Sequence, residues 1–409
     1  MQRGQATLLP SPKVLPILLA VALGLLTAST PPFLSNAGSR RAVACNHEVQ
    51  PASTVFWHAG NFRYLDDMSG DFVMFVQGLE HPNRGGYGKL SSTRTANFNL
   101  FLDALFTAIE ASLADSSTGD WCGVQTKAGA AGYAIARFYD TESGRWFVYA
   151  YDTTPFGQAY FFINPFAKRN IVIEVPHEGF EAGTKTQGAR LFKALAARAF
   201  LINKEHRCSD PDSSDCSGET NVCGGRCGGR FCESDVAHHT ANTFHLLHVR
   251  YTDMDPVTKF VQLHGFDASP RDMAEIGDGT TNDSAPDSVS VLFANNLDKY
   301  VPKPRAVDSC QQYVGDPPSG LCGSSNVQAR YTNNPGGDAC LTFTNTYSAR
   351  FLHLEQGEPL RDDDYSDEWD WGDIRDALLD TWPDCNMNNG ATDCSLGSQQ
   401  TQYSTLTCP

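Results

Sequence analysis

Two apolar runs that each end in a histidine constrain the fold most strongly. Residues 171–175 are followed closely by His177, with Glu181 four residues further on, and residues 259–263 run directly into His264. Continuous apolar runs of this length are typical of strands buried on both faces of a sheet. Open α/β sheets bind ligands outside the carboxyl ends of their strands. The pattern therefore predicts two buried strands that deliver His177 and His264 to one edge of a sheet.

These side chains are suited to metal chemistry. Two neutral imidazoles and one carboxylate form the ligand set of a catalytic zinc ion, with water in the fourth position. We therefore predict that His177, Glu181 and His264 bind Zn²⁺. Glu355 is the predicted general base for the metal-activated water, because it ends another apolar run and shares a strand face with His353. The alternative is that both predicted histidine ligands only cap strands through hydrogen bonds to the backbone.

Other polar residues are candidates for the same site. Arg207 and Arg330 are predicted to bind a substrate carboxylate in bidentate fashion, although surface ion pairing is the alternative for each. His238 lies in a segment with four of the eleven histidines and is either a rival metal ligand or a pocket residue oriented by Asp235. Glu174 interrupts an apolar strand, where an unpaired charge is costly. It is either a partner for a ligand histidine or part of a solvated edge.

The N-terminus and the cysteines predict export. Residues 1–37 contain basic residues, an apolar segment at 14–26 and then small and polar residues, which is the pattern of a secretory signal peptide. The chain has 13 cysteines, which an oxidising compartment lets pair as disulfides. Five of them lie in a predicted insertion at 208–232, for which a structural zinc is the alternative. The expected location is outside the cell, in the periplasm or on the cell surface.

The net charge and the hydropathy of the chain limit the classes of partner that it is expected to bind. The formal charge of −16 argues against nucleic acid, whose phosphates are bound by clustered Lys and Arg. The apolar segment near the N-terminus is too short for a comfortable bilayer span, and no later segment is long and apolar enough. A small molecule or peptide that carries a carboxylate is the predicted substrate, and the sequence leaves the oligomeric state open.

The order of the elements predicts an α/β fold with a mixed, mostly parallel sheet flanked by helices. One domain is expected over residues 38–384, followed by a cysteine-containing tail at 385–409. Apolar periodicity and turn residues predict the elements within it. They are helices at 98–113, 187–201 and 373–382, a hairpin of 133–140 with 146–151, strands at 159–163, 171–175, 259–263, 289–293 and 350–354, and surface loops at 208–232 and 267–287.

The motifs also resemble a known family. Glu174-Val-Pro-His177 with Glu181, Gln262-Leu-His264-Gly265 and Leu354-Glu355-Gln356 are similar in type and order to motifs of the zinc carboxypeptidase-like superfamily, in particular its N-formylglutamate amidohydrolase and poly-gamma-glutamate hydrolase branch. The resemblance implies zinc ligands at 177, 181 and 264 and a catalytic glutamate at 355. It departs from the carboxypeptidase His-x-x-Glu pattern, because three residues separate His177 from Glu181.

Two other classes of function remain open at this point. One is an exported, disulfide-rich binding or surface protein whose histidines are structural. The other is a metal-free esterase, which ranks last because the sequence has no Gly-x-Ser-x-Gly motif.

Overall fold

A ten-stranded mixed sheet forms the centre of the protein, in a computed structural model that describes residues 67–79, 86–114, 119–267, 272–282, 285–301, 306–311, 321–361 and 370–384. The predicted signal peptide and C-terminal tail lie outside these residues. The described residues belong to one compact unit, residues 44–409. The strands are β1 (Asp67–Gly70), β2 (Tyr133–Asp140), β3 (Arg145–Asp152), β4 (Tyr160–Ile163), β5 (Arg169–Val175), β6 (Ala197–Ile202), β7 (Lys259–Gly265), β8 (Asp272–Gly277), β9 (Ala306–Ser309) and β10 (Phe351–Gln356).

The strand order explains how distant sequence motifs meet. It runs β1-β2-β3-β4-β6-β5-β7-β10-β8-β9. Five of the nine neighbouring pairs are parallel, including β6-β5, β5-β7 and β7-β10 at the centre. The carboxyl ends of β5, β7 and β10 therefore lie at the same edge, which confirms the mixed, mostly parallel sheet.

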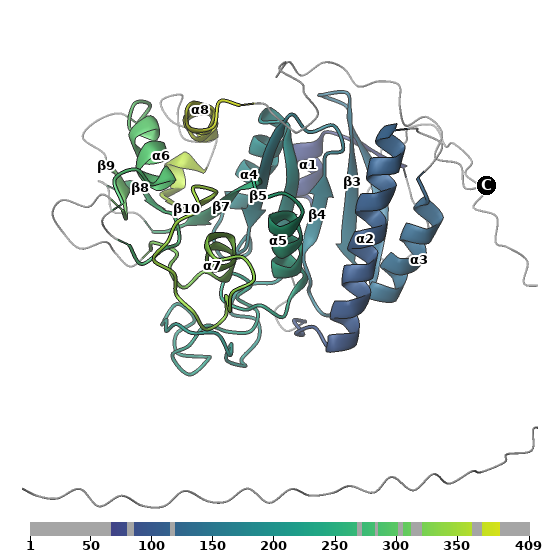
Figure 1. Cartoon of the computed structure of the whole chain (residues 1–409), viewed down its shortest axis with the longest axis horizontal. Coiled ribbons are helices and arrows are strands. Elements are labelled where there is room, and N and C mark those ends of the chain that lie inside the picture. Colours follow the sequence, from purple (N-terminus) through teal and green to yellow (C-terminus); the bar gives the residue numbers. More distant parts are fainter. Residues whose placement is uncertain are drawn as a thin grey trace, which may run out of the picture. The chain divides into compact units, whose positions relative to one another are not determined.

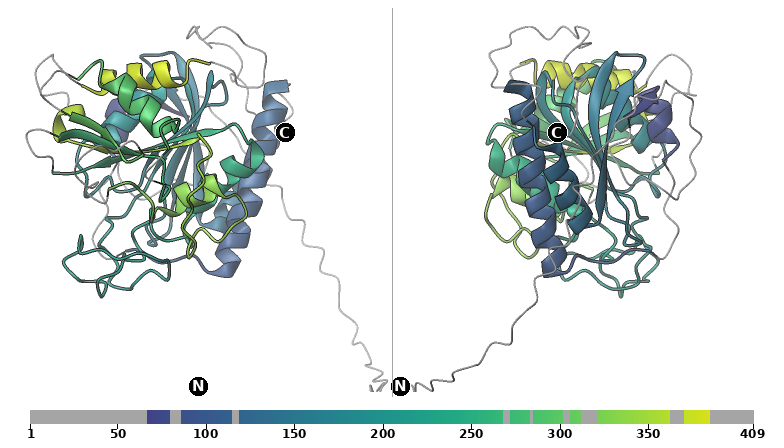
Figure 2. Two further views of the ribbon diagram at one scale, coloured as in Figure 1. Left: turned by 60° about the vertical axis from the view of Figure 1, so that its left-hand side comes forward. Right: turned by 90° about the vertical axis from the view of Figure 1, so that its right-hand side faces the viewer.

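Helices cover both faces of the sheet (Figure 1). The helices are α1 (Phe72–Gln77), α2 (Ser92–Ala114), α3 (Trp121–Ala131), α4 (Thr184–Ala194), α5 (Thr243–Met254), α6 (Val289–Leu297), α7 (Val327–Asn333) and α8 (Trp371–Thr381), with a 3-10 turn at Glu358–Leu360. One apolar cluster joins α1, α4, α6 and α8 to one sheet face, and a second joins α2, α3, α5 and α7 to the other. The edge-on view in Figure 2 shows α1 on the opposite side of the sheet from α2 and α3.

Side chains that alternate along a strand pack into the two apolar clusters on opposite faces of the sheet. In β3, Phe147 and Tyr149 pack in the first cluster, whereas Val148 and Ala150 pack in the second. Every residue of β5 is buried, as the continuous apolar run predicts. The predicted hairpin is confirmed, because β2 and β3 pair antiparallel over their full length. The predicted helices at 98–113 and 373–382 and the strands at 159–163, 171–175, 259–263 and 350–354 are also present, with ends shifted by a few residues.

Three predicted elements were wrong. The helix expected over 187–201 is α4, which ends at Ala194, because Ala196 has a φ of 46° and the chain then enters the buried strand β6. Residues 289–293 belong to helix α6 rather than to a strand, since the side chain of Ser288 accepts from the Ser290 amide at the helix start. The expected loop at 267–287 contains β8, which pairs with β10 and β9.

The cysteine-rich insertion contains no helix or named strand among its residues, all of which the structure describes. Disulfides hold it instead: Cys208 pairs with Cys223, Cys227 with Cys232, and Cys216 with Cys340. A structural zinc at these cysteines is excluded, since all five sulfurs are in disulfides. Elsewhere Cys310 pairs with Cys322. Among the described helices, none has the length and apolar character needed to cross a bilayer.

Candidate metal centre

Strand register aligns polar residues across one face of the central sheet. Glu174 of β5 is the partner of Gln262 in β7, and Gln262 is the partner of His353 in β10. In the next row with the same orientation, His264 of β7 is the partner of Glu355 in β10. Phe260, which precedes Gln262 by two residues, packs on the side of α5 and α7, so alternation places these polar side chains on that side too.

His177, Glu181 and His264 meet at the edge of the sheet. His177 Nδ1 lies 2.9 Å from Glu181 Oε1, and His264 Nδ1 lies 3.4 Å from Glu181 Oε2. The two imidazole centroids are 4.9 Å apart. Glu181 reaches both because residues 177–181 turn back on themselves, with the amide of Glu181 donating to the carbonyl of His177. The structure therefore brings the three predicted metal ligands together, and all are buried.

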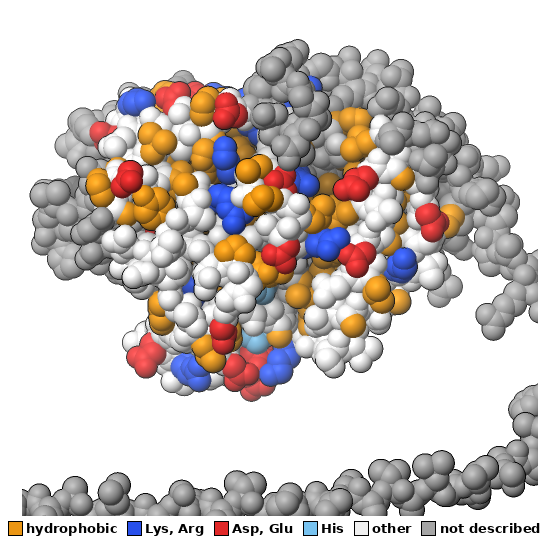
Figure 3. Space-filling model, in the orientation of Figure 1, with side chains coloured by type: hydrophobic (Ala, Val, Ile, Leu, Met, Phe, Trp, Pro, Cys, Tyr) orange, Lys and Arg blue, Asp and Glu red, His pale blue; other side chains and the backbone are white. Residues whose placement is uncertain are grey.

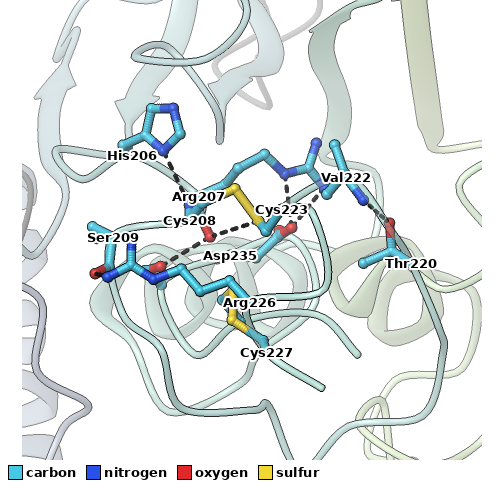
Figure 4. Close-up of a disulfide and its surroundings, with 12 residues drawn as sticks. His206, Arg207, Cys208, Ser209, Thr220, Val222, Cys223, Arg226, Cys227 and Asp235 are labelled. Atoms are coloured by element: carbon cyan, nitrogen blue, oxygen red, sulfur yellow. Dashed lines mark hydrogen bonds and ion pairs between the residues drawn. A yellow bond between two sulfur atoms is a disulfide. The ribbon is translucent and has the colours of Figure 1, made fainter. Parts of the chain in front are cut away.

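Asp235 and Arg207 complete this cluster from the two flanks of the cysteine-rich insertion. Asp235 Oδ1 lies 2.8 Å from His177 Nε2. Arg207 donates from Nε and Nη2 to Asp235 Oδ2, and Figure 4 shows these contacts. The two distances are 2.9 and 2.6 Å, and Arg207 Nη1 lies 3.3 Å from Glu181 Oε1. The disulfide of Cys208, the residue after Arg207, fastens this loop. The guanidinium therefore orients two carboxylates of the cluster.

The charges of the cluster shift its pKa values. Burial alone would raise the pKa of Asp235, but the charges of Arg207 and His177 hold it well below the usual range. Burial likewise opposes ionisation of Glu181, but the adjacent imidazoles of His177 and His264 hold its pKa far below normal. Burial and Arg207 lower the pKa of His177, but Glu181 and Asp235 raise it above its ordinary value. Both carboxylates are thus anionic at neutral pH.

The three predicted ligands fit a zinc ion. One ligand atom from each of His177, Glu181 and His264 lies within 4.8 Å of the others. Two ligands about 2.1 Å from a tetrahedral zinc stand roughly 3.4 Å apart, which is close to the 2.9 and 3.4 Å observed. Both imidazoles turn Nδ1 toward Glu181, while Nε2 faces an acceptor, Asp235 for one and Gln262 for the other. Outer hydrogen bonds of this kind orient metal-binding histidines.

Glu355 lies beside this cluster. Its Oε1 is 3.1 Å from His353 Nε2, and the two residues share a strand face as the alternation predicts. The rings of His353 and His264 are 4.2 Å apart, and a second possible ligand group consists of His264, His353 and Glu355. Burial, with His353 nearby, lowers the pKa of His264 to about 4. The predicted base is therefore adjacent to a neutral imidazole.

Two predicted binding residues make other contacts. Arg330 donates to the carbonyls of Ser324, Ala339 and Cys340 and to Ser217, and its guanidinium lies 3.9 Å from the centroid of the Phe343 ring. These contacts hold the cysteine-rich insertion, and a substrate role for Arg330 stays a prediction without support from its position.

His238 stacks on Phe231 with centroids 3.5 Å apart and bonds through Nδ1 to the carbonyl of Ser325. Burial lowers its pKa to about 3, although the charge of Asp235 opposes the shift. The carboxylate of Asp235 bonds the ring of His177, whereas its backbone carbonyl accepts from the amide of His238. His238 precedes α5, which begins at Thr243 and carries His245 and His248.

Sequence reasoning missed the depth of the polar network behind the cluster. Glu174 is completely buried and pairs with His248 of α5 at 2.8 Å, so the solvated-edge interpretation was wrong. Gln262 joins Glu174 to His264. The available signal was that the apolar runs 171–175 of β5 and 260–263 of β7 are each interrupted by one long polar side chain, Glu174 and Gln262.

Figure 3, which views the side covered by α2, α5 and α7, shows little histidine surface, and hydrophobic side chains are scattered among charges of both signs.

Comparison with known proteins gives distant matches only. No family model matches the sequence, and no curated protein matches it. Among solved structures, the zinc-free form of YNDL is 12% identical with a TM-score of 0.30, over 55% of this chain and 89% of that one. A metallo-carboxypeptidase from Pseudomonas aeruginosa, in complex with (2-guanidinoethylmercapto)succinic acid, is 13% identical with a TM-score of 0.27, over 55% of this chain and 58% of that one. Similarities at this level carry no argument about function.

Proposed function

We propose that this protein is an exported zinc-dependent hydrolase of amide bonds, of the peptidase or amidohydrolase type. One observation carries the proposal: the imidazoles of His177 and His264 turn Nδ1 toward the carboxylate of Glu181, and each holds Nε2 against an acceptor. The motifs that resemble the zinc carboxypeptidase-like superfamily support the same ligand set. The disulfides support export, because such bonds persist in oxidising compartments.

The residues of the chain have distinct tasks in this reaction. A zinc ion held by His177, Glu181 and His264 would lower the pKa of a bound water and polarise the substrate carbonyl. Glu355, next to His264 in the sheet, accepts the proton of the attacking water and returns it to the departing amine. His353 holds Oε1 of Glu355 at 3.1 Å and so orients the carboxylate.

The proposed substrate carries a carboxylate. Arg207 is the predicted cation closest to the cluster, but all three of its guanidinium nitrogens contact Asp235 or Glu181. We therefore assign it first to orienting those carboxylates. Arg207 would also attract the substrate carboxylate, because its charge and that of a bound zinc ion both favour an anion close to the metal.

Hydrolysis by zinc-loaded protein tests the proposal. N-acyl amino acids and short peptides with a free carboxylate are incubated with the wild type, Glu355→Gln and the matched control Glu358→Gln, whose side chain is exposed three residues away. Loss of the general base should lower kcat by about 10²- to 10⁴-fold without loss of zinc, and the control should match the wild type. Equal rates for Glu355→Gln and the wild type would contradict the assigned role.

One observation favours the second candidate, an exported binding or surface protein without catalysis. Asp235, Arg207, His177 and Glu181 are buried and pair with one another, so their charges are balanced without an ion. Such a network also occurs as purely structural support. Stoichiometric zinc in the purified protein separates the two candidates, because the structural network needs none.

A further inference from the structure

A chain of buried hydrogen bonds runs from helix α7 to the proposed zinc ligand His264. Thr332 Oγ1 lies 2.8 Å from His248 Nε2, and His248 Nδ1 lies 2.8 Å from Glu174 Oε1. Glu174 Oε2 accepts from Gln262 Nε2 at 3.0 Å, and Gln262 Oε1 lies 2.8 Å from His264 Nε2. All five residues are at most 1% exposed. Water therefore does not replace these partners, and each donor must meet an acceptor.

Two neighbours determine which way the Gln262 amide points. An ionised glutamate only accepts hydrogen bonds, so Glu174 requires the NH₂ group of Gln262 on its side. Asn326 acts from the other side: its Oδ1 caps α7 by accepting from the amides of Gln328 and Ala329, which leaves its Nδ2 to donate to Gln262 Oε1. Both contacts place the oxygen of Gln262 toward His264. An amide turned the other way would set its oxygen against a carboxylate and its NH₂ against another NH₂.

The orientation of the Gln262 amide determines which ring nitrogen of His264 carries the hydrogen. Because Gln262 Oε1 only accepts, His264 Nε2 must carry a hydrogen. The Nδ1 atom, 3.4 Å from Glu181 Oε2, then has the lone pair that a metal ion needs. Asp235 likewise accepts from Nε2 of His177, so both imidazoles present Nδ1 to Glu181.

We propose that Gln262 is a positioning residue that sets the tautomer and ring orientation of His264, and that Glu174 and Asn326 hold its amide in the required direction. Glu174 is itself held by His248, so α5 and α7 support the ligand from the face opposite to α4. The inference rests on the proposed function, because orienting His264 is useful only if His264 binds zinc. The tautomer itself is a property of the chain with or without metal.

The test combines ¹⁵N NMR of the histidine rings with a zinc competition titration. In zinc-free wild type at about pH 8, above the ordinary histidine pKa, His264 should give the signature of a ring protonated at Nε2. Gln262→Leu removes the acceptor at similar volume, so the Nε2–H signature should be lost and zinc should bind about 10- to 100-fold more weakly. Gln311→Leu removes an equally buried glutamine that bonds Asp278 and Ser290 instead, and should keep both properties.

A double variant separates the hydrogen bond from a general effect on packing. Glu174→Gln combined with Gln262→Glu exchanges the amide and the carboxylate. The new carboxylate at position 262 still accepts from His264 Nε2, and the new amide at position 174 still bonds the side chain at position 262. It should restore the Nε2–H signature and most of the zinc affinity. Its failure to restore them, or unchanged tautomer and affinity in Gln262→Leu, would overturn the proposal.

The wild type provides a test that does not depend on the stability of any variant. A ring protonated only at Nδ1 in the wild type would overturn the inference directly. Failure of the proposed function is distinguishable from this, because it appears as absence of zinc binding while the tautomer of His264 remains Nε2–H.

Discussion

Replacing Asp235 by asparagine should weaken zinc binding and destabilise the protein. Asp235 accepts one hydrogen bond from His177 Nε2 on Oδ1 and two from Arg207 on Oδ2. An asparagine has one acceptor oxygen, so its NH₂ group faces either Arg207 or His177. In the first case the guanidinium loses both bonds. In the second case His177 must carry its hydrogen on Nδ1, the atom that faces Glu181.

The magnitudes follow from the burial of these groups. Removing one partner of a buried ion pair costs about 3–5 kcal/mol, and Asp235 and Arg207 are both buried. Loss of an outer partner of a metal-binding histidine weakens affinity about 10- to 100-fold, which is roughly 1.4–2.7 kcal/mol. We therefore expect a decrease of about 3–5 kcal/mol in the unfolding free energy of the zinc-free variant and a zinc Kd higher by at least about tenfold.

The assays are urea unfolding of the zinc-free protein and zinc titration against a coloured chelator. Asp253→Asn is the matched control, because Asp253 is exposed and bonds only the hydroxyl of Tyr331 in the described structure. The control should keep the wild-type Kd and lose less than about 1 kcal/mol. Wild-type zinc affinity in Asp235→Asn would refute the role assigned to this carboxylate.

Three further predictions concern stability. Burial lowers the pKa of His238 and His245 to about 3 and that of His239 and His264 to about 4, so below about pH 6.5 the unfolded chain takes up protons that the folded, zinc-free one does not. The unfolding free energy should therefore fall as pH falls, by up to about 5 kcal/mol per pH unit. His177 and Glu205, whose raised pKa values have the opposite sign, offset part of this fall, and a flat profile from pH 7 to pH 5 would contradict the prediction. Replacing both cysteines of Cys216–Cys340 by serine should cost about 5 kcal/mol in urea unfolding, against about 3 for Cys310–Cys322, because the sequence separations are 124 and 12; equal losses would contradict the loop argument. Arg330→Ala should cost at least about 3 kcal/mol and leave zinc affinity unchanged, because its donors hold the cysteine-rich insertion; a large change in affinity with little loss of stability would place Arg330 at the site instead.

The sequence was informative where a single strand carries the signal. The ends of β5 and β7 and the alternation in β10 were enough to predict that His177, Glu181 and His264 meet and that His353 and Glu355 share a face. These predictions depend on local periodicity, which side-chain alternation in a strand translates directly into position.

The remainder of the site depends on contacts between distant segments. Glu174 and His248 are 74 residues apart, and His177 and Asp235 are 58 apart. No periodic pattern links Asp235 to the sheet, since it follows an insertion whose path the disulfides determine. Similarly, residues 289–293 form a short apolar run whose periodicity alone does not distinguish a buried helix from a strand.

Zinc content tests the central claim most directly. Wild type and His264→Ala are purified in parallel, loaded with zinc, dialysed against metal-free buffer and assayed for zinc per chain by mass spectrometry, with circular dichroism to confirm folding. The account predicts about one zinc per wild-type chain, held by three protein ligands, and almost none in the folded variant. A wild type that retains no zinc, or a variant that retains as much as the wild type, would contradict it.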